Sequence, residues 1–270
     1  MDNVPGRPDQ PGIQPRGVGE ILQAGFELYR RHWQELMTIA AGVVVPVTLV
    51  QYFLMHQLAA KAEIVNRNGQ LTLQVSNGFF RRLAFTAVVA LLSALLYQVL
   101  TGALTRAIAG DFVGTSFSLE DNYRFALSKL GPILIVSILA GLAVAAGFIL
   151  FVIPGIWIAV RLSVTGPSLI IENQQGTKAL ARSWNLVRGF WWQVFAVFFV
   201  AVLLSGIVSA VLALPFGRNW FLRSIGAMIG SIVTLPFTTS VLVLVYLDLR
   251  TRKEQLDVGR LKAELDATGI

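Results

Sequence analysis

The sequence predicts an all-α integral membrane protein with six transmembrane helices, arranged as three pseudo-repeats of an interfacial amphipathic helix followed by a transmembrane hairpin. Three observations lead to this prediction: long stretches without charged residues, an unequal distribution of Lys and Arg between alternate loops, and an amphipathic pattern that recurs along the chain. The composition agrees, because 55% of the 270 residues are hydrophobic and only 14% are charged.

The apolar stretches are long enough to cross a membrane. Five of them run for at least 23 residues without Asp, Glu, Lys or Arg: Leu36–Ala60, Leu83–Thr105, Pro132–Val160, Gly189–Gly217 and Ser224–Leu247. A helix rises about 1.5 Å per residue and the hydrocarbon core of a bilayer is about 30 Å thick, so about 20 apolar residues are enough for one crossing.

The third stretch is too long for one helix. Pro154 removes a backbone donor and Gly155 relaxes the turn, so we expect one span to end near Ile153 and the next to cover about Gly155–Ile171. This second span contains Arg161. The chain then has six spans, with both ends on the same side of the membrane.

The basic residues predict which side that is. Fifteen Lys and Arg lie on the side of the N-terminus and six lie on the opposite side, so the positive-inside rule places both termini in the cytoplasm. The largest external loop is Lys61–Arg82, in which the alternation of Leu71–Val75 predicts a short strand or hairpin arm. The net charge of +7 comes from residues between apolar spans, so we expect no nucleic-acid partner.

The chain divides into three parts. Residues 1–19, rich in Pro and without an apolar core, are expected to form a disordered cytoplasmic tail, and they are not a signal peptide. Residues 20–249 form the membrane domain. Residues 250–270 form a charged cytoplasmic tail, in which Leu256, Leu261 and Leu265 predict a short helix that is either exposed to solvent or docked on a cytoplasmic partner.

An amphipathic helix precedes the first, third and fifth spans. Its first copy has the apolar residues Leu22, Phe26, Tyr29 and Trp33, with Glu20, Gln23, Glu27, Arg30 and Gln34 on the other face. A shift of 158 residues gives Leu180, Trp184, Val187 and Trp191, with Lys178, Arg182, Asn185 and Arg188 opposite. A shift of 99 gives a weaker copy with Phe125, Leu127 and Lys129, which begins at a capping box of Ser118 and Asp121.

Basic faces at a cytoplasmic leaflet attract anionic headgroups by about 1 kcal/mol per charge. Arg161 is a further candidate, because ionisable groups inside spans are costly and have partners. The predicted anion- or lipid-binding residues are Arg161, Arg30, Arg31, Lys178, Arg182 and Arg188. Two alternatives remain open: the helices merely connect spans and dock on the bundle, and Arg161 snorkels or donates to carbonyls freed at Pro154.

The sequence contains no recognisable catalytic or metal-binding motif. The chain has no Cys, and its two histidines, His32 and His56, are expected on opposite sides of the membrane, so they cannot share a metal. Glu172, Asp248 and Asp111 lie at span ends, where we expect them to pair with nearby Arg or Lys. We therefore predict no catalytic, metal-binding or cofactor-binding residues and no enzyme activity.

Four passages resemble a known family. They are Val18-Gly19-Glu20-Ile21-Leu22 with Phe26-Glu27-Leu28-Tyr29-Arg30-Arg31-His32-Trp33, Ile153-Pro154-Gly155-Ile156-Trp157 with Arg161-Leu162-Ser163, Ala179-Leu180-Ala181-Arg182-Ser183-Trp184-Asn185-Leu186-Val187-Arg188-Gly189, and Tyr246-Leu247-Asp248-Leu249-Arg250-Thr251-Arg252-Lys253-Glu254. The chain is similar in them to the membrane-domain family named after glycerophosphoryl diester phosphodiesterases. The resemblance implies a six-span protein of the bacterial cytoplasmic membrane. In some members this domain is attached to a soluble phosphodiesterase barrel, which these 270 residues do not contain.

Three hypotheses about function follow. The favoured one is a non-catalytic membrane protein that binds or organises anionic lipid, or membrane or cytoplasmic partner proteins, at the cytoplasmic leaflet. The second is a transporter or exporter of a small amphiphile or anion through a cavity near Arg161 and Gln98, although carriers commonly use more intramembrane ionisable residues than this chain has. The third, implied by the resemblance, is a membrane subunit associated with a glycerophosphodiester phosphodiesterase.

Overall fold

The computed structural model describes residues 14–58, 62–67, 70–75, 79–114, 118–216 and 220–268. These residues form helices and one small β hairpin. In chain order the elements are α1 (Val18–Arg31), α2 (Trp33–Leu58), β1 (Ala62–Arg67), β2 (Gln70–Val75), α3 (Phe79–Asp111), α4 (Leu119–Ser128), α5 (Leu130–Leu150), α6 (Val152–Arg161), α7 (Thr165–Glu172), α8 (Thr177–Val187), α9 (Trp191–Ala213), the 3₁₀ turn η1 (Leu214–Phe216), α10 (Trp220–Glu254) and α11 (Val258–Thr268).

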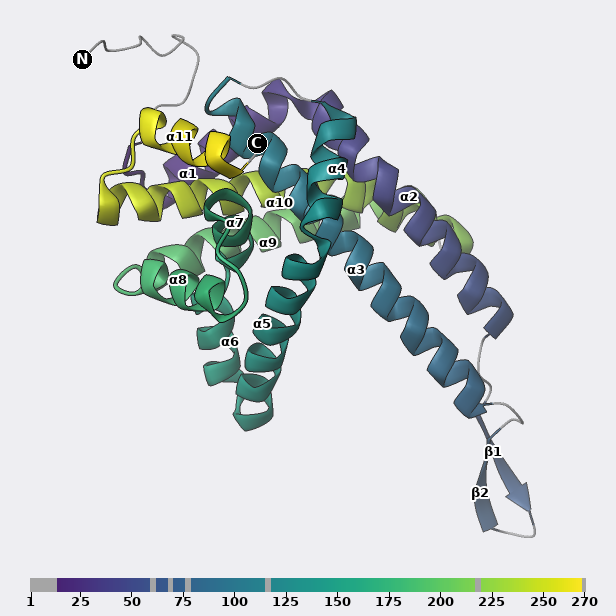
Figure 1. Cartoon of the computed structure of the whole chain (residues 1–270). Helices are drawn as coiled ribbons and strands as arrows, with labels where there is room; N and C mark the ends of the chain where they lie inside the picture. Colours follow the sequence, from purple (N-terminus) through teal and green to yellow (C-terminus); the bar gives the residue numbers. More distant parts are fainter. Residues whose placement is uncertain are drawn as a thin grey trace.

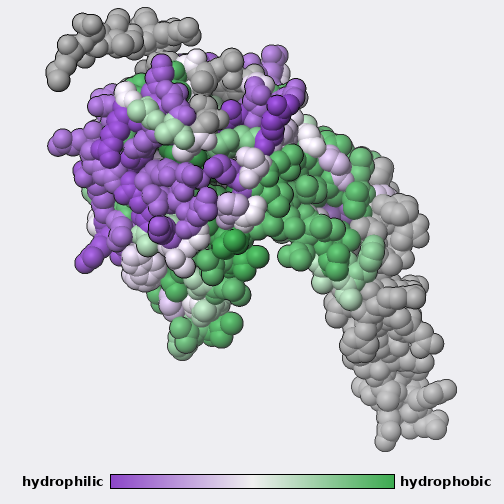
Figure 2. Space-filling view, in the orientation of Figure 1, coloured by the Kyte–Doolittle hydropathy of each residue, from purple (hydrophilic) through white to green (hydrophobic). Residues whose placement is uncertain are grey.

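The helix pairs diverge from one polar end of the molecule. The pairs α2–α3 and α5–α6 point away from each other, while α1, α4, α8 and α11 lie around the end from which they diverge (Figure 1). Figure 2 shows hydrophilic residues gathered over that end and hydrophobic residues along the two diverging pairs. The short amphipathic helices therefore form a polar end, and the long apolar helices extend from it.

Within the described residues, six helices or helix pairs are long and apolar enough to cross a membrane. They are Trp33–Tyr52, Ala84–Asp111, Leu130–Leu150, Val152–Glu172, Trp191–Phe216 and Ser224–Glu254. The number and the order of the predicted apolar spans are thereby confirmed.

The fourth span consists of two short helices, α6 and α7, where the sequence predicted one segment. The chain breaks at Phe151, which has an extended conformation, and Pro154 lies in the first turn of α6, where its missing N–H leaves no hydrogen bond unmade. The predicted span over about Gly155–Ile171 is confirmed by the apolar segment Val152–Glu172, but turns at Leu162–Val164 divide this segment into α6 and α7. Arg161 therefore ends a short helix instead of lying inside a long one.

Two smaller predictions are confirmed. The alternating segment Leu71–Val75 lies in β2, which pairs antiparallel with β1 in a register that places Ala62 opposite Val75. Ser118 caps α4, because its hydroxyl accepts a hydrogen bond from the backbone N–H of Asp121.

The C-terminal segment is part of the folded bundle. α10 continues past the predicted boundary at residue 249 to Glu254, and the side chains of Leu256, Leu261 and Leu265 are buried. α11 packs against α7. The predicted helix is confirmed, and its apolar stripe covers the chain's own core instead of facing solvent. Docking of a cytoplasmic partner on its exposed face stays a prediction.

The N-terminal segment is also attached to the bundle. α1 begins at Val18, and the backbone N–H of Arg16 donates to the Asp248 carboxylate at 2.7 Å. Arg252 holds the same carboxylate at 2.8 Å. Most of the predicted tail, residues 1–13, lies outside the described residues.

Candidate functional site

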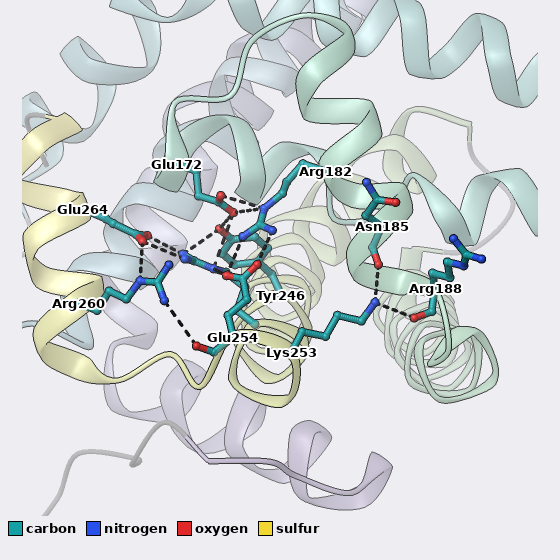
Figure 3. A network of polar contacts seen from close by, with 10 residues as sticks. Glu172, Arg182, Asn185, Arg188, Tyr246, Lys253, Glu254, Arg260 and Glu264 are labelled. Atoms are coloured by element: carbon teal, nitrogen blue, oxygen red, sulfur yellow. Dashed lines mark hydrogen bonds and ion pairs between the residues drawn. The ribbon is translucent and has the colours of Figure 1, made fainter.

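A buried ion network joins α7, α8, α10 and α11 at the polar end. Arg182 donates to Glu172 at 2.8 Å and to Glu254 at 2.8 Å. Arg250 donates to Glu254 at 3.0 Å and to Glu264 at 2.9 Å. Figure 3 shows these side chains converging from the four helices.

The positive charges of the two arginines in this network are balanced by carboxylates. The side chain of Arg250 is only 1% exposed, and its charge is balanced by carboxylates on three sides. Burial alone would lower the pKa of Arg182, but hydrogen bonds to Glu254 and Glu172 outweigh it and raise the pKa. Both arginines therefore stay charged, and their donors are already occupied.

This geometry corrects the prediction for Arg182. We expected it on a basic face that binds anions, but its guanidinium is committed to two carboxylates. The pairing of Glu172 and Asp248 with basic residues is confirmed, since Glu172 holds Arg182 and Asp248 holds Arg252. An internal bidentate pair satisfies an arginine as well as an external phosphate would.

A second group of cations lies beside the network and has no such balance. The Arg161 guanidinium lies against two indoles that contact each other, with its carbon 5.0 Å from the Trp157 ring and 5.3 Å from the Trp184 ring. It donates to the Trp184 carbonyl at 3.1 Å, and Ser183 donates to the Arg161 carbonyl at 2.8 Å. Its Nε is buried without a hydrogen-bond partner among the described residues.

Arg161 is therefore not where the sequence suggested. We expected it inside the fourth span, snorkelling or bonded to carbonyls freed at Pro154. Instead it lies at the C-terminal end of α6, against α8 at the polar end. The carbonyl that it holds belongs to Trp184, not to the break at Phe151.

Two more cations complete the group. Lys253 donates from Nζ to the Arg188 carbonyl at 2.7 Å and also to the Asn185 carbonyl, so it satisfies free carbonyls at the end of α8. Arg161 and Arg188 are close enough to Lys253 to repel its charge. We call Arg161, Arg188 and Lys253 the cation cluster.

The nearest carboxylate to the cation cluster is that of Glu254, which acts on Lys253 through space but is paired with Arg182 and Arg250. None of the ion pairs among the described residues includes Arg161, Arg188 or Lys253. Figure 3 shows the Arg188 side chain free of the dashed contacts that tie its neighbours together. Unbalanced cations beside indole rings are suited to an anion at the boundary between polar and apolar surfaces.

The remaining predicted residues are dispersed. Arg30 and Arg31 are exposed at the end of α1, and Lys178 is exposed in the first turn of α8. They do not join the cation cluster. Lys253 was missed by the sequence reasoning, because its contacts with α8 join residues more than 60 positions apart.

Of the two histidines, His32 is the one whose side chain the structure describes, and it pairs with Asp111. His32 lies 3.0 Å from Asp111, so Asp111 is paired with a histidine and not with the Arg or Lys that we expected. The His56 side chain lies outside the part of the structure that is described. Within the described residues, no group of three His, Asp or Glu side chains could hold a metal ion.

A cavity of about 650 Å³ lies between α3, α5, α6 and α7. Gln98 lines it, together with Thr101, Thr105 and Ser137 among many apolar residues. Arg161 is not among the residues that line it, although Ala159, Leu162 and Ser163 next to it are. The transporter hypothesis, which expected a cavity near Arg161 and Gln98, stays a prediction.

Comparison with known proteins gives no match, because no family model, no curated protein and no solved structure matches this chain.

Proposed function

We propose that this chain is a non-catalytic, multi-pass membrane protein that binds anionic phospholipid headgroups at the polar end of its helix bundle. The observation that carries the proposal is the cation cluster of Arg161, Arg188 and Lys253, which has no carboxylate partner among the described residues. A phosphate would supply the missing negative charge.

The surface supports placement in a membrane. Side chains such as Leu142, Val202 and Ile207 are more than half exposed along the diverging helices, and soluble proteins rarely expose apolar faces of this extent. Hydrocarbon chains would cover these faces. The polar end, with α1, α8 and α11, would lie at the headgroups (Figure 2).

The tryptophans around the cation cluster support its position at the depth of the lipid headgroups. The indoles of Trp157 and Trp184 both contact Arg161, and tryptophan is enriched where hydrocarbon meets headgroups. The Trp192 side chain is 76% exposed at the start of α9, next to the same end of α8. A phosphate bound to Arg161 and Arg188 would leave its acyl chains beside α6 and α9.

The pseudo-repeat is part of the proposal, and the burial pattern supports it. The buried residues of α1, Ile21, Gly25 and Leu28, fall on the buried Ala179, Ser183 and Leu186 of α8 at the shift of 158. The same shift carries the buried Leu36, Ile39 and Val43 onto Val194, Val197 and Ala201. For the third copy, a shift of 97 aligns the buried Leu28 with Phe125, whereas the predicted shift of 99 pairs it with the exposed Leu127.

The cellular placement rests on the sequence. The excess of Lys and Arg at the polar end supports a cytoplasmic position for both termini. The resemblance to the glycerophosphoryl diester phosphodiesterase membrane-domain family supports a bacterial cytoplasmic membrane. Association with such a phosphodiesterase, or with another protein partner, stays a prediction.

The test is native mass spectrometry of the protein extracted gently from its own membrane. We expect a stoichiometric anionic lipid on the wild type, its loss in Arg161→Leu and its retention in Arg161→Lys, which keeps the charge. Arg124→Leu is the matched control, because Arg124 is an exposed arginine of the polar end that is already paired with Glu120.

A lipid that stays bound in Arg161→Leu would contradict the assignment of the site. A co-purifying protein without any bound lipid would contradict lipid binding and favour the partner hypothesis. Far-ultraviolet circular dichroism of each variant establishes that the helices are intact, so that a loss of lipid reports on the site.

A further inference from the structure

We propose that the cavity between α3, α5 and α7 is a second lipid site, which holds an acyl chain of an anionic membrane phospholipid whose phosphate contacts Arg106. This inference rests on the membrane placement proposed above but not on the cation cluster. It goes beyond headgroup binding, because it assigns a cavity inside the bundle to the hydrophobic part of a lipid.

The cavity has the size and lining for such an occupant. Its volume is about 650 Å³, and its walls are mostly apolar, with Val136, Val144 and Phe148 from α5 and Leu169 from α7. It lies where α3 and α5 diverge, and Figure 2 shows the surfaces of these two helix pairs as hydrophobic. An apolar cavity that opens between membrane helices fills with lipid chains, since water gains few hydrogen bonds there.

One wall also presents a polar group without a partner. The Thr105 side chain is 0% exposed, and its hydroxyl makes no hydrogen bond within the described residues, although it lines the cavity. The amide of Gln98 lines the same wall two helical turns earlier. Buried polar groups are normally hydrogen-bonded, so this wall favours an occupant with acceptor oxygens, such as the ester groups of a phospholipid.

A cation next to this wall supplies the charge for a phosphate. Arg106 follows Thr105 in α3 and donates to Asn122 at 3.3 Å, while its Nε is buried without a hydrogen-bond partner. Its guanidinium lies over the Phe125 ring at 5.1 Å. Lys129 lies 5.7 Å from the same ring and donates to Asn173 at 2.9 Å.

Neither cation is neutralised by a close acid. Asp121 acts on Arg106 through space, but no ion pair among the described residues includes Arg106 or Lys129. Phe125, under both cations, belongs to the same apolar cluster as Ile133 and Ile170, which line the cavity. Charge at one end and an apolar cavity at the other match an anionic amphiphile.

Two glycines give a matched test. Gly141 lines the cavity, and a Cβ built there meets no atom within 4 Å, so the backbone position accepts a side chain and we expect the ring of Gly141→Phe to occupy part of the cavity. Gly206 in α9 is equally open but does not line this cavity, so Gly206→Phe is the control. Both changes add the same ring to a glycine in an apolar helix.

The experiment uses the full chain in nanodiscs of phosphatidylglycerol and phosphatidylcholine, followed by native mass spectrometry. We expect Gly141→Phe to retain one phosphatidylglycerol fewer than Gly206→Phe and the wild type. Arg106→Gln should lower the preference for phosphatidylglycerol over phosphatidylcholine at this site by about tenfold, the loss expected for one charge-assisted hydrogen bond.

Each outcome supports or overturns one part of this proposal. Equal lipid numbers in the two phenylalanine variants would overturn the cavity assignment, and an unchanged preference in Arg106→Gln would overturn the anionic ligand. If Gly141→Phe does not fold, Arg106→Gln alone decides. The cation cluster is tested separately, because Arg161→Leu should lose a different lipid and the double variant with Gly141→Phe should lose both.

Discussion

Helices α1 and α8 have the same apolar pattern, but their charged side chains have different partners. In both helices the buried face is narrow and built from small and aliphatic residues, with Gly25 in one and Ser183 in the other at the corresponding position. On the polar face, Arg30 of α1 corresponds to Arg188 after α8, and both are exposed. Arg182 of α8, which corresponds to Ala24 of α1, is held by two carboxylates. The packed face also differs from the predicted apolar face, because Phe26 and Trp33 are about half exposed while Ile21, Gly25 and Leu28 are buried. Periodicity therefore identified the helix, and its neighbours decide which face packs and what the charges do.

The neighbours of the two helices explain the difference. α1 packs on α10 so closely that a Cβ on Gly25 would lie 2.9 Å from Val241. α8 lies where α7, α10 and α11 end, and these ends bring Glu172, Glu254 and Glu264 together. Glu172 and Glu254 therefore lie within reach of Arg182 on α8 and form ion pairs with it.

The largest effect is expected for the residue at the centre of the α8 network. Arg250→Leu leaves three carboxylates near one another without their buried cation, which should lower the free energy of unfolding by about 3–5 kcal/mol. The measurement is unfolding by SDS in mild detergent, followed by circular dichroism. Arg124→Leu, which breaks an exposed pair on α4, should cost less than about 1 kcal/mol. Equal costs would refute the structural role of the network.

A smaller effect separates α8 from α1 directly. Arg182→Gln removes a bidentate partner from Glu172 and Glu254 and should lower the free energy of unfolding by about 1–3 kcal/mol. Arg30→Gln changes the corresponding polar face of α1 and should stay within about 0.5 kcal/mol of the wild type. If the Arg30 variant is the less stable of the two in the same SDS titration, the comparison between the helices is wrong.

The sequence predicted most of the fold because its strongest signals are local. Charge-free stretches define the spans, Ser118 identifies a helix start, and the alternation of Leu71–Val75 identifies a strand. The split between α6 and α7 also had a local signal that was not used. Pro167 falls in the first turn of α7, just as Pro154 falls in the first turn of α6.

The sites were harder to predict because they join distant residues. Arg182 and Glu254 are 72 positions apart, and no spacing rule connects them. Arg161 was singled out as a costly charge, but its environment depends on how α6 packs against Trp184 of α8. The cavity next to Thr105 likewise depends on the angle between α3 and α5, which periodicity does not fix.

The most direct test of the account is the accessibility of single cysteines, because the chain contains no native Cys. Lys178→Cys marks the polar end, Arg218→Cys marks the segment between α9 and α10, and Leu203→Cys marks an exposed apolar side chain of α9. The account predicts that a membrane-impermeant maleimide labels Arg218→Cys in intact bacterial cells expressing the protein and stripped of their outer membrane. It should label Lys178→Cys only after the membrane is opened and Leu203→Cys in neither case. Labelling of Leu203→Cys, or of Lys178→Cys in intact cells, would contradict the proposed insertion.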